Sequence, residues 1–224
     1  DVYKRQGHGK TRNLAARLAR GRVLCLLTQD VLPCSTDWPA RFCRALEDPA
    51  VAGVYGRQIP RSADTMEMFF VAMNYPDHAL RYDPEPGDHH HPRPGRVLFS
   101  NAFSAIRRKN LLQQPYPEDS PVSEDQIFAR RALDRGYAIV YDHRAEALHA
   151  HHYGLKSLFR RSYLVGQALR MEGIAGGATL GESVAFLLHE VKFMARGGHL
   201  PWIPKMLVYE FVRWFGFQAG RRSI

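Results

Sequence analysis

Two short acidic segments carry the residue types best suited to catalysis. Asp30 follows an apolar run, and a carboxylate at the carboxyl end of a strand is well placed to hold a divalent cation that neutralises a departing diphosphate. Glu124 and Asp125 open a predicted helix, where a carboxylate can accept a proton from a substrate hydroxyl. Structural roles suit the same residues: Asp30 as a turn aspartate, and the other two as helix-start acids beside a capping Ser123. Sequence position alone leaves both interpretations open.

Histidines follow the last predicted strand of the α/β region. His149 and His151 are two residues apart, so they project to one face of an extended chain, as a pair of metal ligands must. A second run, at 89–91, lies among prolines and is typical of a surface tract that binds metal only adventitiously. The pair after the strand is therefore the candidate for a metal site.

A segment with two glycines, Gly7-His8-Gly9, precedes Arg12 and Asn13. It resembles a phosphate-binding loop only loosely, because the Lys-Ser/Thr ending of that motif is absent. An arginine near a helix N-terminus is nevertheless a reasonable contact for a diphosphate. Arg12 is the phosphate-binding candidate of this segment.

The elements that must position these residues alternate between strand and helix. This alternation predicts an α/β fold with a doubly wound, mostly parallel sheet flanked by helices. Five prolines between residues 75 and 95 predict a long loop there. The predicted helices cover 11–20, 36–46, 63–73 and 123–135, and the predicted strands cover 22–28, 51–59, 97–99, 137–141 and 145–149.

The pattern changes near residue 153. Three helical segments with apolar stripes follow, beginning near Leu155, Leu180 and Trp202. Residues 153–224 hold 10 Lys and Arg against 4 Asp and Glu, whereas residues 1–152 hold 21 against 18. We therefore divide the chain into an α/β body, 1–152, and a basic amphipathic helical tail, 153–224.

Composition limits the class of protein and partner. The 224 residues are 45% hydrophobic and 24% charged, which is enough for a packed core. Three cysteines without C-x-x-C spacing disfavour a disulfide framework or a thiolate zinc site, and they suit a reducing compartment. No apolar run approaches the roughly 20 residues that cross a bilayer. The net charge of +9 suits nucleic acid, an anionic membrane or a phosphate-bearing small molecule.

Seven segments, taken in order, resemble one known family. They are Lys-Thr-Arg12-Asn13, the apolar strand after it, Thr-Gln-Asp30, Val-Ala-Gly-Val-Tyr-Gly-Arg57-Gln58, Phe-Ser100-Asn101, Ser-Glu124-Asp125-Gln and His149-Ala-His151-His-Tyr. Together they resemble glycosyltransferase family 2, and most closely its bacterial rhamnosyltransferase-like branch, over roughly residues 7–170. The resemblance implies a GT-A-type fold whose first strands are missing from this sequence.

The resemblance also implies a metal site. Asp30 matches the last acid of the family's D-x-D motif, although Thr28 replaces the first acid. His149 matches the late histidine that faces the metal or the diphosphate, with His151 as the alternative. The implied cofactor is a divalent metal, Mg or Mn. Because Thr28 replaces one of the two acids, strong dependence on the metal does not follow from the motif.

Catalytic and binding roles follow from the same matches. Asp125 matches the acid that serves as general base, and Glu124 is its neighbour in the motif. The positions matched to the nucleotide, sugar and acceptor pocket are Arg12, Asn13, Asp30, Arg57, Gln58, Ser100 and Asn101.

The implied enzyme is an inverting glycosyltransferase. It would move a sugar, with rhamnose suggested by the branch, from a nucleoside-diphosphate sugar to a hydroxyl of a cell-envelope glycan or lipid-linked acceptor. We expect a cytoplasmic protein that lies peripherally on the inner face of the plasma membrane through residues 153–224, where aromatic and basic side chains suit an anionic surface. Because the opening strands and the first nucleotide-binding acid are missing, we expect this fragment to be inactive by itself.

Other interpretations remain open on the sequence. The altered D-x-D motif fits a non-catalytic, glycosyltransferase-like scaffold, but retention of Glu124-Asp125 and the late histidines argues against one. The charge, with 25 arginines to 6 lysines, fits a nucleic-acid-binding module, but no helix-turn-helix or RNA-recognition signature is present. The helices of 153–224 can equally serve to pack on the body.

Overall fold

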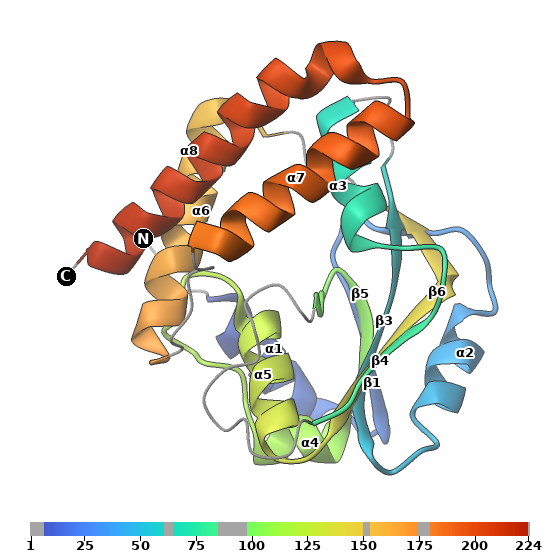
Figure 1. Cartoon of the computed structure of the whole chain (residues 1–224). Helices are drawn as coiled ribbons and strands as arrows, with labels where there is room; N and C mark the ends of the chain where they lie inside the picture. Colours follow the sequence, from blue (N-terminus) through green and yellow to red (C-terminus); the bar gives the residue numbers. More distant parts are fainter. Residues whose placement is uncertain (1–6, 61–64, 85–97, 150–152, 174–179, 224) are drawn as a thin grey trace.

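The computed structural model describes residues 7–60, 65–84, 98–149, 153–173 and 180–223. In these residues a six-stranded sheet has the order β1-β5-β3-β6-β2, and β4 also pairs with β6. Helices flank the sheet, and three long helices gather at one end of it (Figure 1). The strands are β1 Val23–Leu27, β2 Leu32–Pro33, β3 Val51–Ile59, β4 Leu80–Tyr82, β5 Phe103–Arg107 and β6 Ala138–Leu148.

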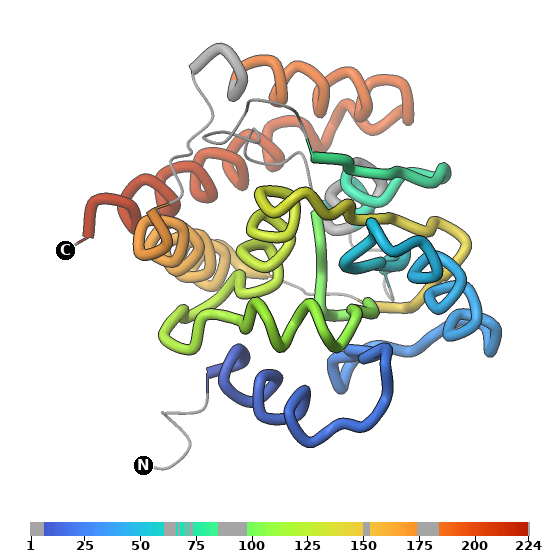
Figure 2. Tube along the Cα trace, turned by 90° about the horizontal axis from the view of Figure 1, so that it is seen from below, coloured from blue at the N-terminus to red at the C-terminus, as the bar shows by residue number. Residues whose placement is uncertain are grey.

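Each face of the sheet has its own core. On one face, α1, α4 and α5 bury Ala16, Leu111 and Phe128 against the strands, whereas on the other face Phe42 of α2 packs on Phe103. Figure 2 shows α1, in blue, lying beside α4, in green. Aromatic and branched side chains fit such half-buried pleated surfaces well. These helices are α1 His8–Leu18, α2 Trp38–Ala45, α3 Thr65–Asn74, α4 Arg108–Gln113 and α5 Glu124–Asp134.

Strand direction corrects one prediction. The α/β class is confirmed, but the sheet is mixed rather than mostly parallel: among the described strands, β3 and β6 form the parallel pair, and the remaining pairs are antiparallel. The cause is the path between β3 and β5. The chain re-enters the sheet at the edge where β3 ends, since Gln58 and Ser100 are hydrogen-bonded there, and β5 must therefore run back between β1 and β3.

The segments around β4 and β5 differ from the predicted ones. Residues 80–82, predicted as loop, form β4 and pair with β6. Leu98 and Phe99, predicted as a strand, lie outside the sheet ladder, and the strand begins at Phe103. Phe99 is fully buried beside Gly53, where a Cβ would come within 3.1 Å of its ring. Its apolar character therefore reflects a core anchor and not a strand. Residue 97 lies outside the described residues.

A bulge explains why the pattern predicts two strands where one exists. β6 runs from Ala138 to Leu148, but its pairing with β3 jumps from Asp142 opposite Gly56 to Glu146 opposite Arg57. Gly56 is required at this point because a Cβ would lie 2.5 Å from the carbonyl oxygen of Ala145. The two predicted segments are thus the two halves of one bulged strand.

The C-terminal helices pack closely on one another. They are α6 Leu155–Met171, α7 Leu180–Arg196 and α8 Ile203–Arg222, with a 3-10 turn, η2 Leu200–Trp202, before the last. α6 crosses α8 at glycines: a Cβ on Gly220 would lie 1.9 Å from the carbonyl oxygen of Tyr163. Phe69 of α3 forms a further buried cluster with Met194 and Met206. The predicted helices are confirmed, and α7 and α8 share a core with α3.

Candidate active site

Three strand ends bring the predicted site residues to one edge of the sheet. β1 and β3 are both antiparallel to β5, and β3 is parallel to β6, so β1, β3 and β6 point the same way. Asp30 follows β1, Gln58 lies near the end of β3, and His149 follows β6. The carboxyl edge of the sheet is where open α/β folds bind their ligands.

A hydrogen-bonded chain connects these residues. The Nδ1 atom of His149 lies 2.7 Å from Oε1 of Gln58, and Nε2 of Gln58 donates to Oγ of Ser100 at 2.9 Å. Because the Gln58 amide nitrogen is donating to Ser100, its oxygen must accept from Nδ1–H of His149. The other ring nitrogen, Nε2, then lies on the side of Asp30, 3.5 Å from Oδ2.

This pair of atoms suits a divalent cation. An imidazole nitrogen and a carboxylate oxygen are ligands that Mn²⁺ accepts, and the Gln58 bond fixes the His149 ring as metal-bound histidines require. No group of three or more His, Cys, Asp and Glu gathers within the described ranges, either here or at another place. Thr28 Oγ1 is buried and has no hydrogen-bond partner in the described part of the chain. His151, the alternative ligand, lies outside the described residues.

The second acidic segment forms the start of α5. The N–H of Asn101 donates to Oδ2 of Asp125 at 3.1 Å, and the N–H of Gln126 donates to Oδ1 at 2.8 Å. Ser123, the predicted cap of the helix, adopts φ 65° and its side chain makes no cap bond. The Asp125 carboxylate therefore takes over part of the capping role, as the open N–H groups of a first turn require.

Burial sets the acidity of Asp125. Desolvation, together with the negative charge of Glu124, raises the pKa of Asp125 to about 6, while the two backbone N–H bonds and the charge of Arg12 act in the opposite direction. A carboxylate with a pKa near 6 is ionised at neutral pH yet is a stronger base than an ordinary aspartate.

Residues 99–101 join the two acidic centres. Ser100 belongs to the His149 chain, whereas the backbone of Asn101 binds Asp125. The segment is tied down because Tyr116 Oη donates to Oδ1 of Asn101 at 2.8 Å, and the Gln126 amide donates to the carbonyl of Phe99. Sequence reasoning missed Tyr116, and its only signal was a tyrosine between two prolines.

Arg12 and Asn13 reach the site from α1 but make contacts within the protein. Arg12 forms an ion pair with Glu124, with 18% and 8% of the two side chains exposed. Asn13 donates to the carbonyl of Tyr116 at 2.9 Å, accepts from its N–H at 2.9 Å, and is 2% exposed. Asn13 therefore anchors the segment that carries Tyr116, and its predicted contact with the nucleotide stays a prediction.

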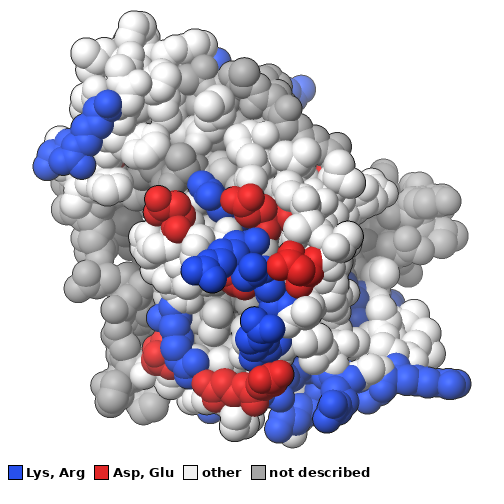
Figure 3. Space-filling model, turned by 90° about the vertical axis from the view of Figure 1, so that its right-hand side faces the viewer, with Lys and Arg blue, Asp and Glu red and all other residues white. Residues whose placement is uncertain are grey.

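Arg57 lies outside the hydrogen-bonded chain. Neighbouring residues of a strand point to opposite faces, and Arg57 Nη1 binds Oε1 of Glu146 at 3.1 Å while Gln58 binds His149. Other ion pairs, such as Arg41 with Asp37 and Arg81 with Asp48, lie around α2 and β4. Figure 3 shows acidic and basic side chains interleaved on one face of the molecule, in contrast to the continuous basic surface typical of nucleic-acid binding.

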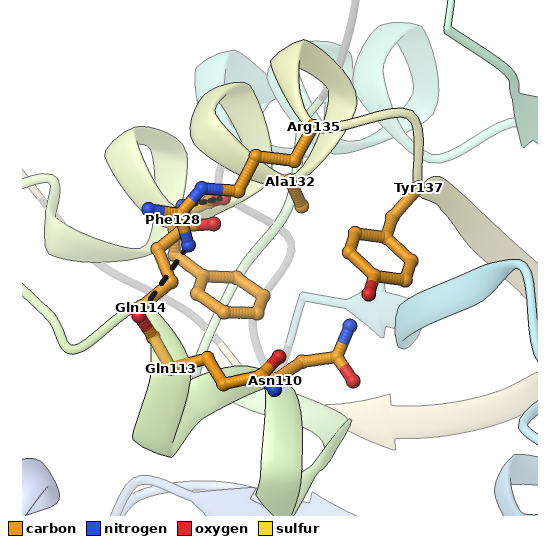
Figure 4. A pocket seen from close by; sticks show the side chains of 7 residues that line it. All are labelled: Asn110, Gln113, Gln114, Phe128, Ala132, Arg135 and Tyr137. Carbon is orange, nitrogen blue, oxygen red and sulfur yellow. Dashed lines mark hydrogen bonds between the residues drawn. The ribbon is translucent and has the colours of Figure 1, made fainter.

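A pocket of about 200 Å³ lies away from these residues, by the C-terminal end of α5. Figure 4 shows the Phe128 ring, the Asn110 amide and the Tyr137 hydroxyl facing it. Asp125 is at the opposite end of the same helix. None of the sequence-predicted site residues lines this pocket.

Two curated proteins are similar to this chain in sequence. No family model matches the chain. The chain is 29% identical to the O-antigen chain rhamnosyltransferase RfbN of Salmonella typhimurium strain LT2, over 96% of the chain and 69% of that protein. It is also 29% identical to the O-antigen chain rhamnosyltransferase WbaN of Salmonella anatum, with the same coverage.

A solved structure supports the fold. The mannosyltransferase PcManGT from Pyrobaculum calidifontis, solved in complex with GDP-Man and Mn²⁺, superposes with a TM-score of 0.57 at 17% identity, covering 96% of this chain and 67% of that one. The likeness at this identity concerns the fold alone. The shared fold and the curated relatives together support a glycosyltransferase with a GT-A-type fold, similar to the O-antigen rhamnosyltransferases.

Proposed function

We propose that this glycosyltransferase inverts the anomeric centre of its donor sugar, with Asp125 as the general base. The observation that carries the proposal is the connection between the two acidic centres: His149 bonds to Gln58 and Gln58 to Ser100, the backbone of residues 100–101 leads on to Asp125, and Oδ2 of Asp30 lies 3.5 Å from Nε2 of His149. It holds a cation-binding edge and a basic carboxylate in one fixed arrangement, as a displacement with an incoming hydroxyl and a leaving diphosphate requires.

The bond changes follow from the roles of these groups. Asp125 takes the proton of the acceptor hydroxyl, and the oxygen attacks the anomeric carbon from the face opposite the diphosphate. The bond between that carbon and the diphosphate oxygen breaks as the new glycosidic bond forms, which inverts the configuration. The carboxylate of Asp125 is oriented by the N–H groups of Asn101 and Gln126, so it needs no reorganisation during the step.

Asp30 and His149 would hold a divalent metal, Mg²⁺ or Mn²⁺. Such an ion supplies positive charge that stabilises a leaving diphosphate. Within the described residues no third His, Cys, Asp or Glu joins this pair, so oxygens of the diphosphate would be needed to complete the coordination. The presence of Mn²⁺ with GDP-Man in the PcManGT complex supports this assignment.

The relatives suggest the substrates. Both curated relatives are named as rhamnosyltransferases of an O-antigen chain, so we propose a nucleoside-diphosphate rhamnose as donor and a hydroxyl of a cell-envelope glycan or its lipid-linked precursor as acceptor. Arg12, Asn13, Arg57, Gln58, Ser100 and Asn101 remain the proposed lining of the donor and acceptor pocket.

Replacement of the base tests the mechanism. In the full-length protein, Asp125→Asn should lower kcat by about 10²–10⁴-fold, because general-base catalysis contributes about that much, while the affinity for the nucleoside diphosphate is kept. The wild-type kcat should fall as the pH drops through about 6, since protonated Asp125 cannot accept a proton.

A matched control is available on the same helix. Asp134, at the C-terminal end of α5, pairs with Arg130 and is far from the substrate edge, so Asp134→Asn should keep wild-type kcat. A wild-type kcat in Asp125→Asn would remove that residue from the base role.

We also propose that residues 153–224 contact an anionic membrane surface at the inner face of the plasma membrane. The outer face of α8 is an apolar stripe, here called the α8 stripe: Leu207, Val208, Phe211, Trp214 and Phe215, each 43–63% exposed. Between residues 184 and 223, the exposed charged side chains are cations, namely Lys192, Arg196, Lys205 and Arg222.

The two acids between residues 184 and 223 are turned away from solvent or paired. Glu190 is 7% exposed, and Glu210 is paired with Arg213. An exposed apolar, Trp-containing stripe, on a segment whose exposed charges between 184 and 223 are cations, matches a lipid surface with anionic headgroups. No described helix is both long and apolar enough to span a bilayer. The proposed contact is that of α8 lying along the membrane surface.

A further inference from the structure

Arg12 pairs with the carboxylate next to the base. We propose that Arg12 is a positioning residue for catalysis, which neutralises Glu124 so that the negative charge presented to the acceptor hydroxyl belongs to Asp125. This inference rests on the proposed function, because it presumes that Asp125 is the base. It gives Arg12 a different task from the diphosphate contact that its sequence position favours.

The geometry supports a dedicated ion pair. Arg12 and Glu124 lie 112 residues apart in sequence, on α1 and α5, and Arg12 Nη1 donates to Oε1 of Glu124. The Glu124 side chain is only 8% exposed. A buried carboxylate without a partner is strongly unfavourable, and here it would also stand next to a second carboxylate. Two adjacent acids at one site raise the pKa of one of them.

Apart from Glu124 and Arg12, the groups that contact Asp125 are neutral, so these two residues determine the net charge next to it. Its oxygens accept from the N–H groups of Asn101 and Gln126. The phenols of Tyr75 and Tyr116 face it from outside α5, and burial raises the pKa of both, so both stay neutral. Arg161 of α6 lies near Tyr75. Glu124 raises the pKa of Asp125, whereas Arg12 lowers it.

The two roles of Arg12 predict different kinetics. As a positioning residue it sets the acidic limb of the pH profile of kcat and leaves donor affinity alone. As a diphosphate ligand it sets the affinity for the nucleoside diphosphate and leaves the acidic limb alone. A pH profile of kcat and a binding titration with the nucleoside diphosphate therefore separate them.

The experiment uses the full-length protein with Arg12→Gln, Arg12→Lys and the double variant Arg12→Gln/Glu124→Gln. In Arg12→Gln the acidic limb should move from about pH 6 to higher pH, and kcat measured below the limb should fall about tenfold for every pH unit that the limb moves. Arg12→Lys should restore most of the rate, because it keeps the charge. The double variant should return the limb close to its wild-type position, since no charge at 124 remains to be neutralised.

Each other outcome counts against the proposal. An acidic limb that stays in place in Arg12→Gln, with weakened nucleoside-diphosphate binding, makes Arg12 a ligand of the donor. If the acidic limb of the double variant lies at the same pH as that of Arg12→Gln, the charge of Glu124 does not cause the shift. Thermal unfolding is recorded for each variant, and if Arg12→Gln does not fold, the limb of Glu124→Gln alone decides: it must move to lower pH. Wild-type kcat in Asp125→Asn overturns the proposed function itself, whatever the Arg12 variants show.

Discussion

Gln58 is the residue that fixes the His149 ring at the proposed cation-binding edge. Its amide accepts from His149 and donates to Ser100, and it is 6% exposed. Gln58→Leu should weaken Mn²⁺ binding by about 10–100-fold, as loss of an outer-shell partner of a metal-binding histidine does. It should also cost about 1–3 kcal/mol of unfolding free energy, because buried polar groups lose their partners.

Calorimetric Mn²⁺ titration and urea unfolding measure these two effects. The matched control is Gln113→Leu, which changes an exposed glutamine on α4 and should leave Mn²⁺ binding unchanged. Equal Mn²⁺ affinity in Gln58→Leu and the wild type would show that the His149 ring does not depend on Gln58.

For single residues, the sequence predicts which side chains lie at the edge of the sheet, but it does not predict which side chains bond to each other. Asp30 and His149 follow strands, and Gln58 lies near the end of one, so their placement at one edge follows from strand order. The partners of Arg12 and Asn13 lie more than 100 residues away in sequence, and no local pattern encodes such contacts. Arg57 and Gln58 are neighbours in one predicted motif, yet strand alternation sends them to opposite faces.

At the scale of elements, the crossing of α6 and α8 depends on glycine. Gly220 leaves no room for a Cβ, which would lie 1.9 Å from the carbonyl oxygen of Tyr163. Gly220→Ala should therefore destabilise the protein by about 1–3 kcal/mol, as overpacking does, even though alanine is intrinsically the better helix former by about 1 kcal/mol.

Urea unfolding measures whether Gly220→Ala lowers or raises the free energy of unfolding. Gly154→Ala is the matched control, because Gly154 precedes α6 with φ −70° and no atom lies within 4 Å of the added Cβ. It should be close to neutral. A stabilised Gly220→Ala would mean that the two helices do not touch at this point.

Element directions also show what alternation of strand and helix can predict. It correctly predicts the α/β class and the positions of β1, β3 and the long helices. It cannot predict the direction of β5, because the chain returns to the sheet from the edge it has just left, as the Gln58–Ser100 bond shows. The short β4 escapes prediction since proline-rich flanks hide a segment that pairs on one side only.

At the scale of the whole molecule, vesicle flotation tests whether the α8 stripe contacts a membrane. Wild-type protein should float with phosphatidylserine-containing vesicles and less so with neutral ones or at high salt, because the cations are screened. The variant Phe211→Ser/Trp214→Ser/Phe215→Ser should lose flotation, since these side chains are 50–63% exposed and supply apolar burial.

A control on α1 removes exposed apolar surface elsewhere. Leu14 and Leu18 are 51% and 74% exposed, and Leu14→Ser/Leu18→Ser should float like the wild type. Absence of flotation in the wild type, together with a dimer that the triple variant abolishes, would assign the α8 stripe to a second copy of the chain.

The turn at residues 100–101 has a consequence for how such an enzyme can diversify. Ser100 bonds to Gln58 in the half of the site proposed to face the diphosphate, and the next residue binds Asp125, the proposed base. Under this proposal one peptide unit serves both substrates, and a change there would alter donor and acceptor handling together. Descendants that acquire a new sugar or a new acceptor one at a time are therefore expected to keep this turn and to vary the residues around it.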